Sequence, residues 1–381
     1  MDTLDNRSCA YGLRHQVHLL TFDEDALDIR TTIYDHDHEI WDISASKESP
    51  DLFFTCYKRV LENKKIESKA TLWRMAPNTP TDPNGLSEPQ HHQSRGHLEE
   101  VLSLDVGDGT VKKVVWQDNT EVISVEDWRI CLWDIDIKQG KAKLTGTIEA
   151  PDRRYKFASA VLNPHAQEVV AIYGRSIHGW DLSSLKTTFA LIDATPAMIL
   201  CIDYNPNKPF QLATGSDDCK LRIWDVHHGA KKPIMVIQDH THWVWDVAYN
   251  KFHDQLVLTS SSDCQVNLQS IVSVSTGADY RFDDQYGGED DMDEDSDRVV
   301  SAEGSHSGDH ADRTSFDRAS PEPQPDVPTD GLVQTYEQHE DSVYQVAWST
   351  VDPWLFMSLS YDGRAVMNQV PREEKFRIIM N

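Results

Sequence analysis

Two histidine–aspartate pairs are the residues in this sequence whose types and spacing could do acid–base chemistry. His240 precedes Asp263 by 23 residues, and His339 precedes Asp362 by the same interval. A histidine that is hydrogen-bonded to a carboxylate can act as a general base in an enzyme. Because the surrounding sequence repeats together with the pair, the pattern favours a structural function, in which each pair stabilises a turn.

An aspartate six residues before a marker position is the wider form of this pattern. The four cases are Asp127–Trp133, Asp218–Trp224, Asp263–Gln269 and Asp362–Asn368. A further repeat has Trp180 at the marker position but Gly174 in place of the aspartate. A carboxylate at this spacing can accept backbone N–H groups of a tight turn and a hydrogen bond from a histidine in the preceding loop. We therefore predict that these aspartates and tryptophans stabilise the fold together with His240 and His339.

Other motifs that could do chemistry are weak. His36 and His38, flanked by Asp35 and Asp37, resemble a metal site, as do the pairs His91–His92 and His227–His228. None has the companion cysteine or histidine spacing of a structural zinc site, so solvated loops are the preferred interpretation. The sequence also lacks a phosphate-binding Gly-x-x-x-x-Gly-Lys loop and a Gly-x-Ser-x-Gly elbow. We predict no catalytic residue, no metal, no cofactor and no enzymatic activity.

The elements that must position these residues are revealed by an internal repeat. Six stretches resemble a hydrophobic strand followed by a turn, and they end at residues 45, 116, 162, 204, 249 and 348. The gaps between these ends are 71, 46, 42, 45 and 99 residues, so three are close to one repeat and two contain an insertion. Trp-Asp follows at residues 133–134, 180–181 and 224–225. A period of about 40–45 residues with short strands and a Trp-Asp signature is typical of β-propeller blades.

The repeat predicts an all-β, seven-bladed propeller. Residues 1–275 would form blades one to six, of which residues 1–38 form an incomplete first blade. Residues 276–332 would be a disordered acidic insertion before the last blade, because residues 279–330 contain 17 Asp and Glu against four Arg. Residues 333–381 would form the last blade, and residues 375–380 a closing strand.

Composition limits the compartment and the partners. The 381 residues carry a net charge of −27, which disfavours nucleic acid and anionic membrane surfaces as partners. The six cysteines are scattered, which favours reduced thiols in the cytoplasm. No signal peptide or run of 18 apolar residues is present, so we expect no direct membrane insertion. We expect a monomeric propeller.

Aromatic residues beside the first strands of two repeats are the candidates for binding a partner, since Trp and Tyr are enriched at binding hot spots. Residues that flank the first-strand valines or precede the turn aspartate should lie on one face of the ring. They are Trp243, Trp245, Ser342, Tyr344, Tyr361, Ser262, Asp217 and Glu126. The alternative is that Trp243 and Trp245 pack between blades.

Four longer stretches carry a resemblance to a known family. They are EIWDISAS (39–46), NPNKPFQLATGSDDCKLRIWD (205–225), HTHWVWDVAYNKFHDQLVLTSSSD (240–263) and YEQHEDSVYQVAWSTVDPWLFMSLSYDGR (336–364). The sequence resembles WD-repeat proteins and, within them, the EARP- and GARP-complex-interacting family of endosomal trafficking. The resemblance implies that this histidine bonds in turn to a strand hydroxyl and to the tryptophan indole N–H. The resemblance is weakest near the N-terminus, which leaves closure of the ring open.

The resemblance implies a non-enzymatic scaffold whose partners are subunits of the EARP and GARP vesicle-tethering complexes. It implies functions in endosomal recycling, endosome-to-trans-Golgi retrograde transport and dense-core vesicle cargo sorting. The protein would then be cytoplasmic and associate peripherally with endosomes and the trans-Golgi network through its partners. An alternative is a nuclear or ubiquitin-ligase-type WD-repeat recognition module. A propeller hydrolase would instead require a cluster of titratable groups in the central channel.

Overall fold

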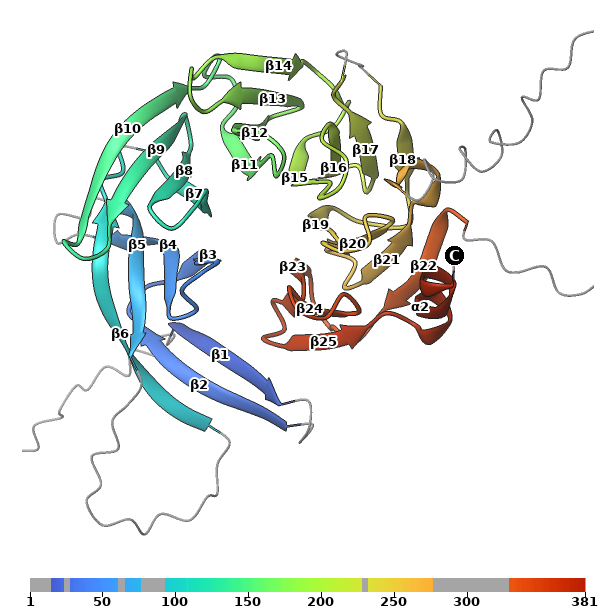
Figure 1. The fold of residues 1–381 in the computed structure, drawn as a ribbon, viewed down its shortest axis with the longest axis horizontal. Coiled ribbons are helices and arrows are strands. Elements are labelled where there is room, and N and C mark those ends of the chain that lie inside the picture. The colour runs from blue at the N-terminus through green and yellow to red at the C-terminus, as the bar shows by residue number, and fades with distance from the viewer. Residues whose placement is uncertain are drawn as a thin grey trace, which may run out of the picture.

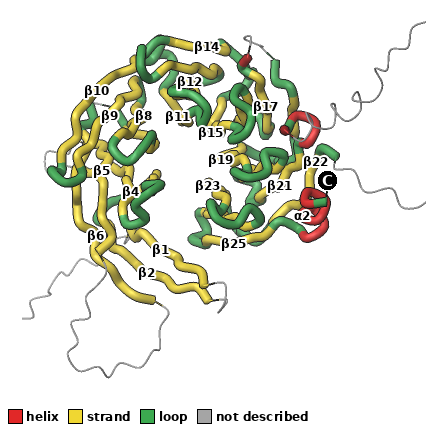
Figure 2. The backbone as a smooth tube through the Cα atoms, viewed as in Figure 1, coloured by secondary structure: helices red, strands yellow, loops and turns green. Residues whose placement is uncertain are grey.

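The computed structural model describes residues 15–23, 28–60, 66–76, 93–107, 109–227, 232–276 and 329–380. Figure 1 shows six β-sheets arranged around a common axis, with the first strand of each repeat innermost. Strands and their connecting turns make up almost all of the backbone trace in Figure 2. The predicted all-β WD-type propeller is confirmed.

Six of the strands form the first sheet, in the order β1-β2-β6-β5-β4-β3. Their bounds are β1 (His15–Asp23), β2 (Asp28–His36), β3 (Ile40–Ala45), β4 (Leu52–Val60), β5 (Ile66–Ala76) and β6 (Gln93–Leu104). All pairs are antiparallel except β2 with β6, which is parallel. Residues 97–104, which belong to β6, pair with β5 and so form the outer strand of the blade that begins with β3.

Four-stranded antiparallel sheets follow along the chain. The second and third consist of β7 (Val111–Trp116), β8 (Glu121–Glu126), β9 (Arg129–Asp136), β10 (Lys141–Glu149), β11 (Phe157–Leu162), β12 (Glu168–Tyr173), β13 (Ser176–Asp181) and β14 (Thr187–Leu191). The fourth and fifth consist of β15 (Ile199–Tyr204), β16 (Gln211–Ser216), β17 (Leu221–Asp225), β18 (Met235–Ile237), β19 (Val244–Tyr249), β20 (Leu256–Ser261), β21 (Val266–Ser270) and β22 (Gly331–Tyr336). The sixth sheet has only three strands, β23 (Val343–Trp348), β24 (Leu355–Ser360) and β25 (Ala365–Gln369).

The prediction of seven blades is wrong, because the strands among the described residues form six sheets. Residues 1–38 do not form a blade of their own, because β1 and β2 form a hairpin that pairs through β2 with β6, the outer strand of the blade β3–β6. Two strands cannot bury a hydrophobic face alone, and pairing with β6 covers one of their edges. Among the described residues, no strand of this hairpin pairs with β25.

Among the described residues, no sheet packs against the inner strand β3 from the side that precedes it in the ring. Ile43 in β3 is 45% exposed, whereas the matching residues Val114 and Val247 are 0% and 3% exposed. In Figure 1 the hairpin β1–β2 and the sheet β23–β25 lie on either side of the place where the ring is open. The described strands therefore form an open arc.

The predicted closing strand is also wrong, since residues 372–379 form helix α2 (Arg372–Ile379). Pro371 precedes its first turn, which contains Glu373 and Glu374, and Arg377 lies in its last turn. These charges suit the helix dipole, and an Arg377–Glu374 ion pair of 2.7 Å links successive turns. The apolar residues within 375–380 suggested a strand. The charged residues Glu373 and Glu374, which come directly before them, lie in the first turn of the helix.

The acidic insertion, predicted to be disordered, lies outside the described residues from 277 to 328. Its two ends are close together, because the backbone N–H of Ser273 donates to Asp330 Oδ1 over 2.8 Å. A short 3₁₀ helix, η2 (Val272–Val274), precedes it, and β22 follows it and pairs with β21. The insertion therefore lies between the third and fourth strands of the fifth sheet, not between two blades.

Hydrophobic layers between successive sheets make up the core. Two of the interfaces between neighbouring sheets contain the same set of hydrogen bonds between their inner strands, called the clamp below. Asp42 accepts the backbone N–H of Val114, and Asp246 accepts that of Val346, over 3.4 and 3.1 Å. Across the same interfaces, the indole N–H of Trp116 donates to the Ser44 carbonyl and that of Trp348 to the Ala248 carbonyl, over 3.0 Å each.

Five cysteines are described, and all are free thiols, as predicted. Burial raises the pKa of Cys131 to about 12, with a further contribution from Glu126, so this thiol is unreactive. The sixth, Cys9, lies outside the described residues. Within the described ranges, no helix has the length and apolar character needed to span a membrane.

Candidate functional site

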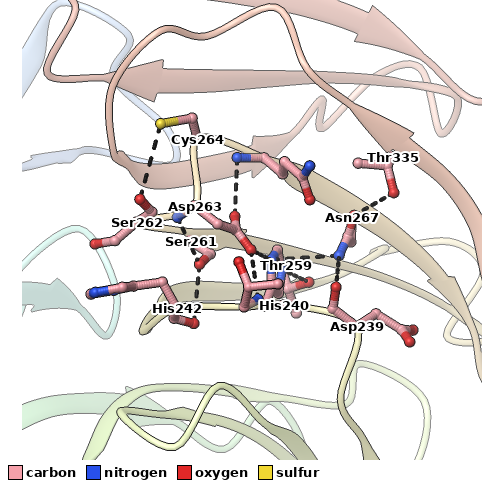
Figure 3. Close-up of polar contacts among 12 residues, drawn as sticks. Asp239, His240, His242, Thr259, Ser261, Ser262, Asp263, Cys264, Asn267 and Thr335 are labelled. Atoms are coloured by element: carbon pink, nitrogen blue, oxygen red, sulfur yellow. Dashed lines mark hydrogen bonds and ion pairs between the residues drawn. The ribbon is translucent and has the colours of Figure 1, made fainter.

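The histidine–aspartate pair of the fifth sheet forms the buried network that its spacing predicted. His240 Nδ1 lies 2.9 Å from Asp263 Oδ2, and His240 Nε2 lies 2.9 Å from Thr259 Oγ1. Asp263 also accepts the backbone N–H of Thr241 and of Gln265. Figure 3 shows His240 beside Thr259 and Asp263. Burial opposes ionisation of Asp263, but the hydrogen bonds from His240 and Thr241 lower its pKa below the usual value.

The sixth sheet repeats this arrangement. His339 Nδ1 lies 3.1 Å from Asp362 Oδ2, and His339 Nε2 lies 2.8 Å from Ser358 Oγ. Despite burial, hydrogen bonds from the backbone of Glu340 and Arg364 and from His339 lower the pKa of Asp362 to about 2. Both ring nitrogens of each histidine are engaged inside the fold, which leaves neither free to exchange a proton with a substrate. The two pairs hold turns in place.

The marker tryptophans are buried and bonded as predicted in two sheets. Trp133 Nε1 donates to Ser124 Oγ over 2.9 Å, and Trp224 Nε1 donates to Thr214 Oγ1 over 2.8 Å. Trp180 is buried and stacks on His178, with ring centroids 5.5 Å apart. Where the marker is an amide, one polar atom has no protein partner, namely Oε1 of Gln269 and Nδ2 of Asn368. These two networks are therefore incomplete.

Asp127 and Asp218 lie in turns but bind no histidine. Asp218 pairs with Arg222, four residues later. Asp127 accepts the backbone N–H of Thr110 and pairs with Lys156 at 2.7 Å and Lys112 at 3.3 Å. These cations take the place that a histidine has in the fifth and sixth sheets.

Asp127 also occupies a different position in its turn from the one that its spacing to Trp133 indicated. Its backbone N–H donates to the carbonyl of the residue before the inner strand, and the same bond is made by the first turn residues of the fourth, fifth and sixth sheets. The bonds are Asp127 to Thr110, Asp217 to Met198, Ser262 to Trp243 and Tyr361 to Ser342. The turn after β8 is shorter, so counting back from Trp133 reached the first turn residue instead of the second.

A network in the first sheet was missed by sequence reasoning. His36 is 6% exposed, and its Nε2 lies 3.3 Å from Thr55 Oγ1, which accepts the indole N–H of Trp73 over 2.8 Å. The signal was present, because His36 precedes Thr55 by 19 residues, as His240 precedes Thr259 and His339 precedes Ser358. Together with the neighbouring His38, His36 resembled a metal site, and the 19-residue spacing to Thr55 was therefore not recognised.

We expect His36→Ala to lower the free energy of unfolding by about 2 kcal/mol, because it removes one of the two hydrogen-bond partners of the buried Thr55 hydroxyl and the ring contacts to Tyr57 and Trp73. Chemical denaturation measures this difference. His227→Ala, an exposed histidine from a second candidate metal pair, serves as the control and should change stability by less than about 0.5 kcal/mol. A zinc-dependent rise in melting temperature of the wild type that His36→Ala abolishes would contradict the structural function.

The described residues contain no group of three or more His, Cys, Asp or Glu side chains that could hold a metal ion. Burial lowers the pKa of His36, so the ring is neutral within the sheet. The His91–His92 pair and residue His228 lie outside the described ranges. Solvated loops, the interpretation preferred for the metal-like motifs, do not describe His36, which is a core residue.

The candidate partner-binding residues of the fifth and sixth sheets gather at one end of the ring. Trp243 is 44% exposed and Tyr361 is 70% exposed. The Trp243 and Trp245 rings are 5.7 Å apart, and the Tyr344 and Tyr361 rings are 4.7 Å apart. The Trp245 indole N–H donates to Ser262 Oγ. Trp243 is thus mainly a surface residue, whereas Trp245 is half-buried.

A β-bulge places these aromatic residues. The inner strands shift register at the same point, between Ile40 and Asp42, Val111 and Lys113, Ile199 and Cys201, Val244 and Asp246, and Val343 and Gln345. Trp245 and Tyr344 are the bulged residues of the last two sheets, so they occupy matching positions on one face. A bulge re-aims a side chain away from the sheet, and the four aromatic residues Trp243, Trp245, Tyr344 and Tyr361 are called the aromatic surface below.

The remaining candidates are placed less favourably for binding. Glu126 is 1% exposed and pairs with Arg129 at 2.7 Å, so it does not lie on the surface. Asp217 is half-buried and accepts the backbone N–H of Met198 over 3.0 Å. Ser342 and Ser262 are half-buried beside the aromatic residues.

A cavity of about 800 Å³ lies at the opposite ends of the inner strands. Its lining includes Trp116, Leu162 and Tyr204 from three sheets, with Lys47 and Lys251 as its cations. Lys251 lies 3.3 Å from Asp203 and is thereby neutralised. The surface of this cavity is mainly apolar.

Comparison with known proteins supports the resemblance. Residues 7–269 match the family described as EIPR1 beta-propeller, and residues 331–367 match the WD domain, G-beta repeat. The chain is 35% identical to "EARP and GARP complex-interacting protein 1" of Rattus norvegicus and to that of Homo sapiens, over 96% of this chain and 90% of each relative. It is 26% identical to "WD repeat-containing protein DWA2" of Arabidopsis thaliana over 93% of this chain and 86% of that protein.

Proposed function

Since the chain belongs to the EIPR1 β-propeller family, we propose that it is a non-enzymatic adaptor that binds the EARP and GARP vesicle-tethering complexes. The observation that carries the proposal is 35% identity across 96% of the chain to relatives whose names state this interaction. The internal hydrogen bonding of both histidine–aspartate pairs supports a scaffold over a hydrolase.

The cellular function follows from these partners. The protein would support endosomal recycling, endosome-to-trans-Golgi retrograde transport and the sorting of dense-core vesicle cargo. It would be cytoplasmic and reach endosomes and the trans-Golgi network through the tethering complexes, as a monomer that binds no nucleic acid. Fluorescence microscopy of the tagged full chain tests this location. A purely nuclear signal would favour the recognition-module alternative.

We propose that the aromatic surface contacts the tethering complexes. Trp and Tyr provide large contact areas at low entropic cost, and hot-spot residues of this type often contribute 2 kcal/mol or more to binding, which is roughly 30-fold in affinity. The two aromatic pairs lie on neighbouring sheets, because the Val346 N–H of β23, the strand that contains Tyr344, donates to Asp246 of β19, the strand that contains Trp245. They can therefore form one contact area.

Trp243→Ala combined with Tyr361→Ala is expected to weaken binding to purified EARP or GARP by at least about tenfold. Surface-immobilised full chain and purified complexes in biolayer interferometry measure the change. Phe252→Ala is the matched control, because Phe252 is 46% exposed, close to the 44% of Trp243, but lies in the turn at the far end of β19. Equal affinity for both variants would place the contact elsewhere, and absence of wild-type binding to either complex would refute the proposed function.

A further inference from the structure

The rim of the aromatic surface is acidic. This negative charge limits the kind of peptide segment that the aromatic surface can bind. Glu340 is 75% exposed in its side chain, and Asp341 and Glu337 are also exposed. Glu337 accepts a hydrogen bond from Gln265 in the turn of the fifth sheet over 2.9 Å, which brings it toward that turn. Asp341 precedes Ser342, whose carbonyl binds the backbone N–H of Tyr361. The carboxylates thus border the two aromatic pairs.

Most of the nearby cations are already paired. Arg364 lies 2.8 Å from Glu340, and Arg222 is buried against Asp218. Half-buried Lys220 and exposed His242 complete the set of basic residues at these turns. Against them stand the two buried turn carboxylates Asp263 and Asp362, together with the half-buried Asp217 and the exposed acidic rim. The balance at this end of the fifth and sixth sheets is negative.

The pKa values of two cysteines in these turns show the effect of the same carboxylates. Burial is the first cause that raises the pKa of Cys264, and Asp341, Asp263 and Asp362 raise it further. Burial likewise raises the pKa of Cys219, with contributions from Asp218, Asp263 and Asp217 that Lys220 only partly offsets. Carboxylates of three successive sheets therefore act together at these turns.

The matching positions of the first three sheets have the opposite character. Lys58 lies 5.1 Å above the ring of Trp41, and Lys156 lies 5.6 Å above that of Trp128. Lys112 is the bulged residue of β7. One face of the ring therefore changes from lysines on the early sheets, two of which pair with Asp127, to open aromatic rings with an exposed acidic rim on the late ones. The chain's own acidic insertion, with 17 Asp and Glu against four Arg over residues 279–330, would be repelled by the late sheets.

We infer that the aromatic surface binds a basic segment of a partner, in which lysine or arginine side chains contact the rings and the carboxylate rim while an apolar side chain packs on Trp243. Cation–π contact and charge complementarity both favour such a segment and disfavour an acidic one. The identity of the physiological partner rests on the proposed function. The chemistry of the surface does not.

A peptide experiment tests the surface without any tethering complex. The full chain is labelled with 5-fluorotryptophan, and the resonances of residues 243 and 245 are assigned with Trp243→Phe and Trp245→Phe. A short peptide of repeating lysine, serine and leucine should shift these two resonances and no other. The same peptide with glutamate in place of lysine should leave them unchanged. Equal shifts with both peptides, or no shift with either, would overturn the inference.

A second experiment measures charge in the intact complex. Glu340→Gln with Asp341→Asn should slow association with purified EARP or GARP by about three- to tenfold at low salt and flatten its salt dependence. Glu99→Gln with Glu100→Gln removes the same charge from the exposed outer strand β6 and should leave the rate unchanged. Equal or faster association of the rim variant would contradict the inference. If wild type binds no complex, the proposed function fails, while the peptide experiment still decides the chemistry of the surface.

Discussion

Trp224→Ala should lower the free energy of unfolding by about 4 kcal/mol, more than any single change to the surface. Trp224 is fully buried and packs with Tyr204 and Leu212 in the core between the third and fourth sheets. Truncation leaves a cavity of indole size and removes the donor to Thr214 Oγ1, which lies 2.8 Å away. Urea denaturation followed by fluorescence and circular dichroism measures the shift in midpoint.

Two variants separate the causes of this loss. Trp224→Phe keeps most of the volume but removes the N–H, so about 2 kcal/mol is expected from the smaller ring and the unpaired hydroxyl. Trp243→Ala makes the same chemical change at a residue that is 44% exposed and should cost less than about 1 kcal/mol. If Trp224→Ala cost no more than Trp243→Ala, the marker tryptophans would not be core residues.

Asp246→Ala should cost about 2 kcal/mol at neutral pH and loosen the sixth sheet first. Its carboxylate accepts the backbone N–H of Val346 over 3.1 Å and that of Val247 over 3.0 Å, so truncation leaves both donors unpaired. The sixth sheet has a neighbour on one side only within the described residues. Hydrogen exchange should therefore accelerate in β23–β25 more than in β7–β10, and uniform acceleration would contradict the clamp.

The same residue predicts the pH dependence of stability. Burial raises the pKa of Asp246 to about 6, although Lys113 and two backbone N–H groups favour the charged form. A raised pKa means that the folded protein binds the proton more tightly than the unfolded chain does. This side chain therefore stabilises the fold more below its folded pKa, and its contribution falls as the pH rises from 5 to 7.5, by about 1 kcal/mol.

Asp246→Asn provides the control for this titration. The amide keeps an oxygen that can accept the Val346 N–H but cannot ionise, so the variant should lose about 1 kcal/mol less than the wild type over the same pH interval. Asp42, whose pKa burial also raises to about 6, remains in both proteins and cancels in the comparison. Identical pH profiles for wild type and Asp246→Asn would show that Asp246 does not titrate in this range.

Local patterns allowed the sheets and much of the networks to be predicted. Val244, Val247 and Tyr249 are all nearly or fully buried, as their spacing on an inner strand requires. His240 and His339 reach Asp263 and Asp362 because one blade contains both partners, which lie at a fixed distance along the chain. Asp127 and His36 were misplaced where that local spacing changed, at a shortened turn and beside a second histidine.

The sequence by itself determined the all-β repeat, the two histidine–aspartate networks, the buried tryptophans and the family. Each of these is specified within about one repeat, where strand periodicity and turn chemistry act over short distances. Only the tertiary structure decided that the described strands form six sheets, that β2 pairs with β6 in parallel, and that Glu126 is buried while Trp243 and Tyr361 are exposed. These outcomes depend on which strand edges pair and which sheet faces are covered. Both involve contacts between segments far apart in the sequence, which the spacing within one repeat does not encode.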